Sequence, residues 1–124
     1  MSYIFENIKE SDRTIWWPSN VVALAFLGDV HLLEKETGLM SGMKESASNM
    51  ITIDPEPLQK FAVAAFNFWS ESNNQSLKVL LQGAMLHLIA LCIACGKESC
   101  FERLKIGDLL NDARTLVHNV FEHG

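Results

Sequence analysis

The stretch from residue 77 to residue 95 has the hydrophobic pattern of a helix that is buried on all sides. Its last eight residues, 88–95, carry no polar side chain except two thiols. A helix without a polar face has no side to turn toward water, so other elements are expected to enclose it. Ser76 before this stretch can cap a helix, and Gly96 after it can end one. The sequence therefore predicts a buried central helix at about residues 76–95.

Three further segments repeat apolar residues at the spacing of a helix that faces a core on one side. The first covers residues 20–38 and ends at a glycine. The second begins at Asp54, which can cap a helix whose first turn contains a proline. The third covers residues 99–122, where Gly107 leaves open whether there is one bent helix or two. We therefore predict an all-α fold, a compact bundle of four to five helices around the buried central helix.

Two segments lack a clear helical period. Residues 3–8 fit either a short helix or an arm that packs against the bundle. Residues 41–53 predict a long loop, since the helices of a bundle are usually joined by about 2–8 residues and longer loops are often functional. Within that loop, only residues 50–53 have a pattern that fits extended backbone. The predicted organisation is a single helical domain over residues 1–124, with a long loop at about residues 41–53.

Composition and charge restrict the classes of partner. The chain of 124 residues is 48% hydrophobic and 20% charged, which is ordinary for a protein that folds around a core. Fifteen acidic residues against ten basic ones give a net charge of −5, and the basic residues form no cluster. Nucleic acids and anionic membranes bind clustered basic residues, so we expect neither as a partner. Lys78, Gln82 and His87 also interrupt the predicted central helix, which argues against a membrane span.

The three cysteines favour a reducing compartment and do not predict a cofactor site. Their odd number gives no disulfide framework, and the N-terminus lacks the pattern of a secretory signal, so we expect a cytoplasmic protein. Cys92 and Cys95 form a CxxC pair, but it lies at the end of a helix, where the helix dipole does not stabilise a thiolate. His87, Cys92, Cys95 and Cys100 lack the spaced pairs of a zinc site. We therefore predict no metal and no cofactor.

Asp29 and His87 are polar residues on helix faces that are otherwise apolar. A buried carboxylate is costly unless it is paired, so we predict that these two residues form a structural polar pair inside the bundle, with Arg114 as another candidate partner of Asp29. Exposure of Asp29 in a narrow stripe shared with Glu36 is the alternative. His87 also lies in line with small residues, which is typical of a close contact between two helices.

A competing interpretation is a small helical enzyme or a metal-dependent protein. Its candidate residues are either Asp29 with His87, or Arg114, His118 and Glu122, which recur at every fourth position of the last predicted helix. The second set combines a cation, a base and an acid, the groups that general acid-base catalysis uses. It can equally form ion pairs on a solvated helix face, and the sequence contains no recognised catalytic motif. We therefore predict no enzymatic activity.

The residues predicted to contact a partner are methionines, tryptophans and acidic side chains around the first long helix and the loop. Methionine adapts to many surfaces, and tryptophan is frequent at interface hot spots. The set is Trp16, Trp17, Glu34, Glu36, Met40, Met43 and Met50. We predict a non-enzymatic domain that binds a basic protein, in the form of a small acidic inhibitor such as an immunity protein or antitoxin that neutralises a basic, nuclease-like toxin. A homodimer is a further alternative.

Overall fold

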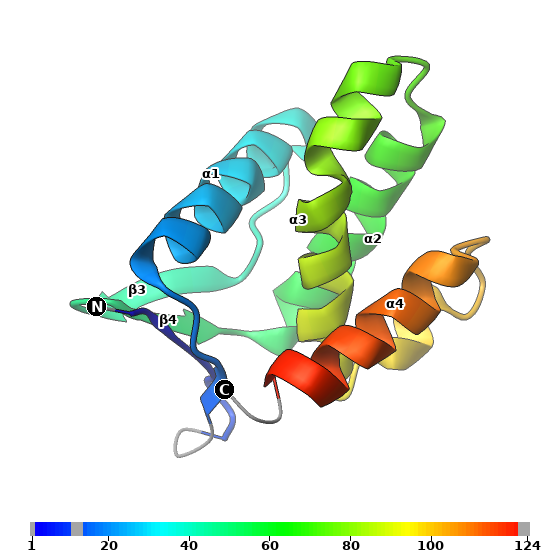
Figure 1. The fold of residues 1–124 in the computed structure, drawn as a ribbon. Coiled ribbons are helices and arrows are strands. Elements are labelled where there is room, and N and C mark those ends of the chain that lie inside the picture. The colour runs from blue at the N-terminus through cyan, green and yellow to red at the C-terminus, as the bar shows by residue number, and fades with distance from the viewer. Residues whose placement is uncertain (1, 11–13, 122–124) are drawn as a thin grey trace.

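A mixed sheet and four α-helices make up the fold in the computed structural model, which describes residues 2–10 and 14–121 (Figure 1). The prediction of an all-α bundle is wrong, because four short strands join the helices in an α+β fold. In chain order the elements are β1 (Ile4–Asn7), β2 (Thr14–Trp16), α1 (Asn20–Thr37), β3 (Met43–Ala47), β4 (Met50–Ile53), α2 (Pro55–Glu71), α3 (Gln75–Ala94), the short 3₁₀ helix η1 (Glu98–Phe101), α4 (Asp108–Leu116) and the π-helical turn η2 (Val117–Phe121).

The strands form one sheet in the order β2-β1-β4-β3. β1 pairs with β4 in parallel, with Ile4 opposite Met50, and the two outer pairs are antiparallel. The predicted loop at residues 41–53 is therefore wrong, since it contains β3 and β4. The turn between these strands includes Asn49, whose φ of 60° is a left-handed conformation that asparagine tolerates better than most residues. In the N-terminal segment 3–8, β1 takes the place of the expected helix or arm.

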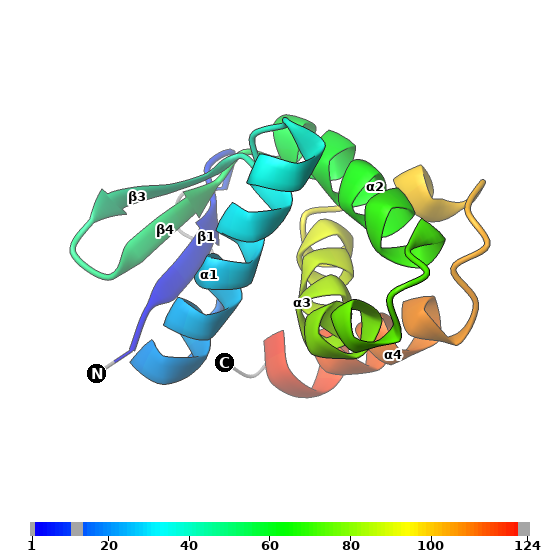
Figure 2. The same ribbon diagram turned by 90° about the horizontal axis from the view of Figure 1, so that it is seen from above.

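The physical reason for this error is the length of the strands. They have four, three, five and four residues, too few for alternation to be distinguished from a loop. The alternation is nevertheless present in the fold, because Phe5, Ile51 and Ile53 turn toward the core. The Phe5 ring lies 6.1 Å from the ring of Phe26 on α1. Figure 2 shows the sheet on one side of α1 and the other three helices on its other side.

The bounds predicted for the first long helix and the start predicted for the second are confirmed. Ser19, one residue before the predicted start of the first helix, caps α1 by accepting a backbone hydrogen bond at 3.4 Å, and Gly38 follows the end of α1 with a left-handed φ of 72°. Asp54 caps α2 by accepting a backbone hydrogen bond at 3.3 Å, and Pro55 occupies the first turn. Local capping chemistry was therefore sufficient to place both helices.

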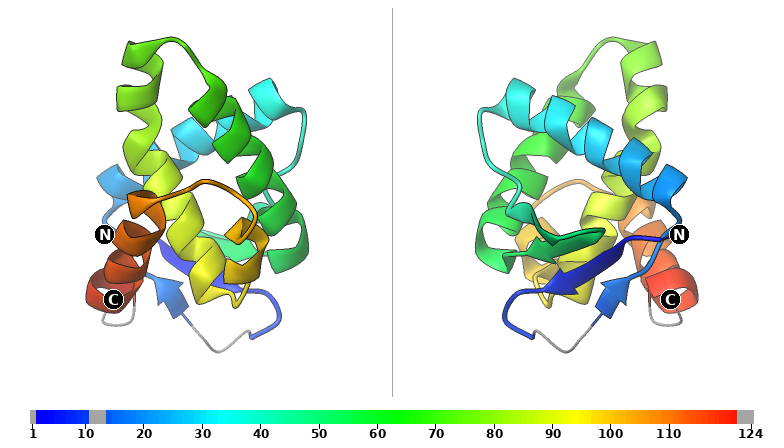
Figure 3. Two further views of the ribbon diagram at one scale, coloured as in Figure 1. Left: turned by 90° about the vertical axis from the view of Figure 1, so that its right-hand side faces the viewer. Right: turned by 90° about the vertical axis from the view of Figure 1, so that its left-hand side faces the viewer.

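The predicted central helix is present as α3, but only its C-terminal half is enclosed. Leu88 and Leu91 are fully buried there, whereas Val79 and Leu80 in the N-terminal half are 60% and 76% exposed. Figure 3 shows α3 between α2 and α4. Within the described residues, α3 is the one helix that is long and apolar enough to cross a membrane, and 44% of the tested window is buried in the fold. Burial in a core therefore accounts for part of its apolar character.

The described part of the predicted helix at residues 99–122 is divided rather than bent. Its first residues belong to η1, and Gly107, with a φ of 59°, precedes α4. The chain then widens into the π-helical turn η2, which ends at the buried Phe121. This last turn brings Phe121 against the strand β2, where it contributes to the site described next.

Candidate functional site

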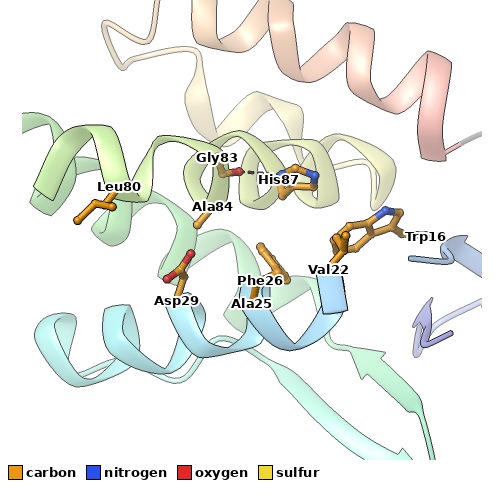
Figure 4. A pocket seen from close by; sticks show the side chains of 9 residues that line it. All are labelled: Trp16, Val22, Ala25, Phe26, Asp29, Leu80, Gly83, Ala84 and His87. Carbon is orange, nitrogen blue, oxygen red and sulfur yellow. Dashed lines mark hydrogen bonds between the residues drawn. The ribbon is translucent and has the colours of Figure 1, made fainter. Parts of the chain in front are cut away.

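A groove opens between α1 and the N-terminal half of α3, and we call it the α1–α3 groove (Figure 4). Its hollow measures about 240 Å³. Residues of α1 form one wall, residues of α3 form the other, and the end of β2 closes the groove at one side. The lining residues are Trp16, Val22, Ala25, Phe26, Asp29, Leu80, Gly83, Ala84 and His87.

An aromatic cluster holds the closed end of the groove. The Trp16 ring stacks on Phe121 with centroids 5.3 Å apart, and it meets the edge of Phe26 at 5.4 Å. The His87 ring lies 5.1 Å from the Trp16 ring. Its Nδ1–H donates to the Gly83 carbonyl oxygen at 2.7 Å, because a carbonyl can only accept, and this leaves Nε2 for other contacts. Packing and this hydrogen bond thus fix His87 in one orientation.

The inner walls of the groove are made of small residues. Ala25 comes from α1, and Gly83 and Ala84 come from α3. A Cβ atom added to Gly83 would meet no atom within 4 Å, so the space above this glycine is open. Small residues at this spacing let another chain approach the two helices closely.

Large apolar side chains are exposed on the two helices around this hollow. Val22 of α1 and Leu80 of α3 line it, and their chain neighbours Val21 and Val79 are also exposed. Single exposed apolar residues are ordinary, but a group of them beside a groove is typical of an interaction site. The apolar surface therefore extends beyond the hollow itself.

Asp29 is the acidic residue that lines the groove. It is half-buried, and burial raises the pKa of its carboxyl group. Within residues 2–10 and 14–121, neither a lysine nor an arginine lines the groove, and Asp29 makes no hydrogen bond or ion pair. Figure 4 shows Asp29 directed from α1 toward Ala84, while His87 lies further along α3 next to Trp16. The structure thus brings the predicted pair of Asp29 and His87 into one groove, without a hydrogen bond between them.

The residues predicted to contact a partner near the first helix have different roles. Trp16 is buried and lines the groove, whereas Trp17 is exposed and its indole N–H donates to the Ser2 hydroxyl. The Glu34 carboxylate accepts a hydrogen bond from the backbone N–H of Ser41 at 2.9 Å, so it supports the chain after α1. Glu36 is exposed on α1. Of these four, only Trp16 belongs to the groove.

The three predicted methionines lie near the sheet, away from the α1–α3 groove. Met40 and Met43 line a separate hollow of about 350 Å³, together with Ile8. Met50 is half-buried on β4, in register with Ile4 of β1. The predicted partner residues therefore do not form one surface. Trp16 lines the α1–α3 groove, Met40 and Met43 line a second hollow, and the other four lie in neither.

Of the two residue sets of the enzyme interpretation, Asp29 and His87 both line the α1–α3 groove, whereas Arg114 and His118 do not. Arg114 forms an ion pair with Glu98, and His118 is exposed in η2. Glu122 lies outside the described residues. Residues 2–10 and 14–121 contain no group of three or more His, Cys, Asp or Glu side chains that could hold a metal ion.

The cysteines lie at the enclosed end of α3. The pKa of the buried Cys92 thiol is raised, first by its hydrogen bond with Cys100 and then by burial. The same hydrogen bond lowers the pKa of the Cys100 thiol, which is half-buried. Cys95 is also half-buried, and none of the three cysteines forms a disulfide. None of them lines the α1–α3 groove.

Most groove residues are hard to recognise from the sequence, because an apolar position with a helical period is expected to face the core. Val22, Ala25, Leu80 and Gly83 occupy such positions, yet all four are exposed. The sequence of the helix at residues 20–37 does indicate exposed apolar residues, because apolar side chains occur on more than one side of it. A helix in a small domain can bury only the sides that neighbours cover, so a second apolar side can indicate a contact surface.

Comparison with known proteins gives one match. A model described as "Family of unknown function (DUF6086)" matches residues 1–120. No curated protein and no solved structure matches the chain. The match covers both helices of the groove but attaches no activity to them.

Proposed function

Since the chain belongs to the DUF6086 family, whose function is unknown, we propose a function from its structure: a non-enzymatic domain that binds a basic protein through the α1–α3 groove. The observation that carries this proposal is the exposed apolar surface on both sides of a groove that contains one uncompensated carboxylate, Asp29. Apolar side chains in water favour association with another apolar surface. The carboxylate gives that surface a preferred charge in its partner.

The size of the groove supports a protein partner over a small molecule. Pockets that enclose drug-sized ligands usually measure about 300–1,000 Å³. The α1–α3 groove holds about 240 Å³ and is flanked by exposed residues such as Val21 and Val79 that a small ligand inside it would leave uncovered. A partner with an extended surface would cover the hollow and its surroundings together.

The arrangement of polar groups supports binding over catalysis. Asp29 and His87 are the titratable residues that line the groove, and they lie at different places along it. General acid-base catalysis requires groups that converge on one reacting atom. The net charge of −5 favours the approach of a basic protein. A finer form of the proposal is an inhibitor such as an immunity protein or antitoxin that acts in the cytoplasm on a basic, nuclease-like toxin, and three cysteines without a disulfide fit such a compartment.

The test compares two glycine substitutions that add the same side chain. Gly83→Leu fills the groove, whereas Gly28→Leu adds a leucine to an exposed position of α1 that does not line it. An added Cβ meets no atom within 4 Å at either glycine, so both variants are expected to fold. The tagged full chain is isolated from cells that express it, co-purifying proteins are identified by mass spectrometry, and the dissociation constant of the partner is measured by calorimetry.

We expect the partner to be basic and Gly83→Leu to weaken its binding by about tenfold or more. Gly28→Leu is expected to bind within about twofold of the wild-type protein. Equal binding by Gly83→Leu and wild type contradicts the proposal. Weakening by Gly28→Leu alone also contradicts it, because the contact would then lie elsewhere on α1. Circular dichroism of both variants controls for loss of helix.

A further inference from the structure

We infer that the α1–α3 groove binds an amphipathic helix of the partner protein, and that a lysine or arginine of this helix pairs with Asp29. The inference rests on the proposed function and specifies the occupant of the same site. Both walls of the groove are helices, whose backbone donors and acceptors are used within each helix. The two helical walls therefore offer no sheet edge to an added strand, and the edge strand β2 reaches the groove only with its last residue, Trp16. Recognition must therefore use side chains, and a helix presents them on one face at a spacing of three and four residues.

The walls of the groove fit a third helix. Ala25, Gly83 and Ala84 leave its inner surface without large side chains, and close helix contacts need such small residues. Phe26 and Trp16 at the closed end offer aromatic surface for an apolar residue of the occupant. Leu80 at the other side is exposed and can pack against the next turn of that helix. Apolar anchors on two successive turns would thus be accommodated.

Asp29 determines what else the occupant must carry. A helix that covered the groove would remove water from this carboxylate, and a buried charge without a partner is strongly unfavourable. Among the residues that the structure describes, neither a lysine nor an arginine lines the groove, and none of them gives Asp29 a hydrogen bond or ion pair. Burial already raises the pKa of the carboxyl group in the free protein. An occupant that supplies a cation offsets this cost, and one that lacks a cation is rejected.

The same carboxylate argues against two other occupants. In a symmetric dimer built on this face, each copy would place its Asp29 in the shared interface, between chains that each carry a net charge of −5. A membrane would surround the carboxylate with hydrocarbon chains that offer no hydrogen-bond donor. A basic helix satisfies both the apolar walls and the charge.

The probe is a displayed library of helical peptides of about 18 residues on an alanine-rich scaffold, with one face varied. The library is selected on the wild-type full chain, and the dissociation constants of the selected peptides are measured by fluorescence polarisation.

We expect selected sequences to carry a lysine or arginine that is flanked by large apolar residues at the helical spacing. Replacing this cation by glutamine is expected to weaken binding to the wild-type chain by about tenfold. The same replacement should change binding to Asp29→Asn by less than about twofold. Asp29→Glu should restore the preference for the cation.

The outcomes separate this inference from the proposed function. If selected peptides are blocked by Gly83→Leu but show no preference for a cation, the inference is wrong and the proposed function stands. If no peptide is selected, or if Gly83→Leu has no effect on those selected, both are wrong. A stable dimer that Leu80→Glu dissociates identifies a second copy as the occupant. Co-sedimentation with phosphatidylcholine–phosphatidylglycerol vesicles that Leu80→Glu abolishes identifies a membrane. Either result overturns the inference.

Discussion

The two halves of α3 carry similar aliphatic side chains but have different surroundings. In the C-terminal half, Leu88 and Leu91 are fully buried, because α2, η1 and α4 pack around them (Figure 3). In the N-terminal half, Val79 and Leu80 remain exposed beside the α1–α3 groove. One half thus stabilises the domain, while the other leaves an apolar surface exposed to solvent. The apolar character of a helix alone does not distinguish these two uses.

The difference arises from the neighbours of the helix rather than from the helix itself. α4 and η2 return along the C-terminal half after the chain has turned at Gly96 and Gly107. The N-terminal half has α2 on one side, but α1 leaves the space above Gly83 open. This difference between the two halves of α3 predicts effects on the unfolding free energy and on its pH dependence.

The largest expected effect is on stability when the same residue type is truncated in each half. Leu88→Ala removes a fully buried side chain, and such truncations cost about 2–5 kcal/mol of unfolding free energy. Leu80→Ala removes a side chain that is 76% exposed, and we expect a change within about 0.5 kcal/mol. Urea denaturation of the two variants measures the difference. Similar losses for both would show that the N-terminal half is as enclosed as the C-terminal half.

The predictions from sequence that succeeded depended on local chemistry. Gly38, and Asp54 with the proline after it, bound their helices through contacts a few residues apart. The sheet depends on contacts that are distant in sequence, because β1 at Ile4–Asn7 pairs in parallel with β4 at Met50–Ile53. No local pattern in three to five residues specifies that pairing, so the fold class was missed.

Only part of the candidate site can be predicted from the sequence, because local patterns distinguish some of its residues and not others. Asp29 and His87 were noticed because a polar residue on an apolar face conflicts with its local pattern, and both line the groove. Leu80 and Val22 have the helical spacing of residues that face a core, so the sequence alone does not identify them as exposed. Whether a neighbour covers such residues depends on how α1 and α3 are placed, which is a property of the whole fold.

A second prediction adds side-chain volume to each half of α3. Ala90 is fully buried, so Ala90→Leu must displace packed neighbours, which costs about 1–3 kcal/mol of unfolding free energy. At Gly83 an added Cβ meets no atom within 4 Å, so Gly83→Ala gains helix propensity of about 0.5–1 kcal/mol without a clash. Gly28→Ala on α1 is the matched control and should gain a similar amount. Destabilisation by Gly83→Ala would mean that the groove is filled in the free protein.

The smallest expected effect is a pH dependence of the unfolding free energy that comes from Asp29, which lines the α1–α3 groove. Burial raises the pKa of this carboxyl group above its ordinary value of 3.8, so the folded chain holds the proton to higher pH than the unfolded chain does. The stability that Asp29 contributes is therefore present below the ordinary value and is lost as the pH rises through the raised pKa. We expect Asp29→Asn to be more stable than wild type at pH 7, by at most about 0.5 kcal/mol because the residue is only half-buried, and the difference to shrink toward acid pH. Urea denaturation across this pH range measures the difference in stability, with Asp112→Asn on the exposed side of α4 as the control for removing one negative charge.

If the stability advantage of Asp29→Asn grew toward acid pH, the carboxylate would have a favourable partner within the chain and the groove would need no cation from outside. If Asp29→Asn stabilises the free protein yet loses the preference for a cationic peptide, the residue is retained for binding at the expense of stability.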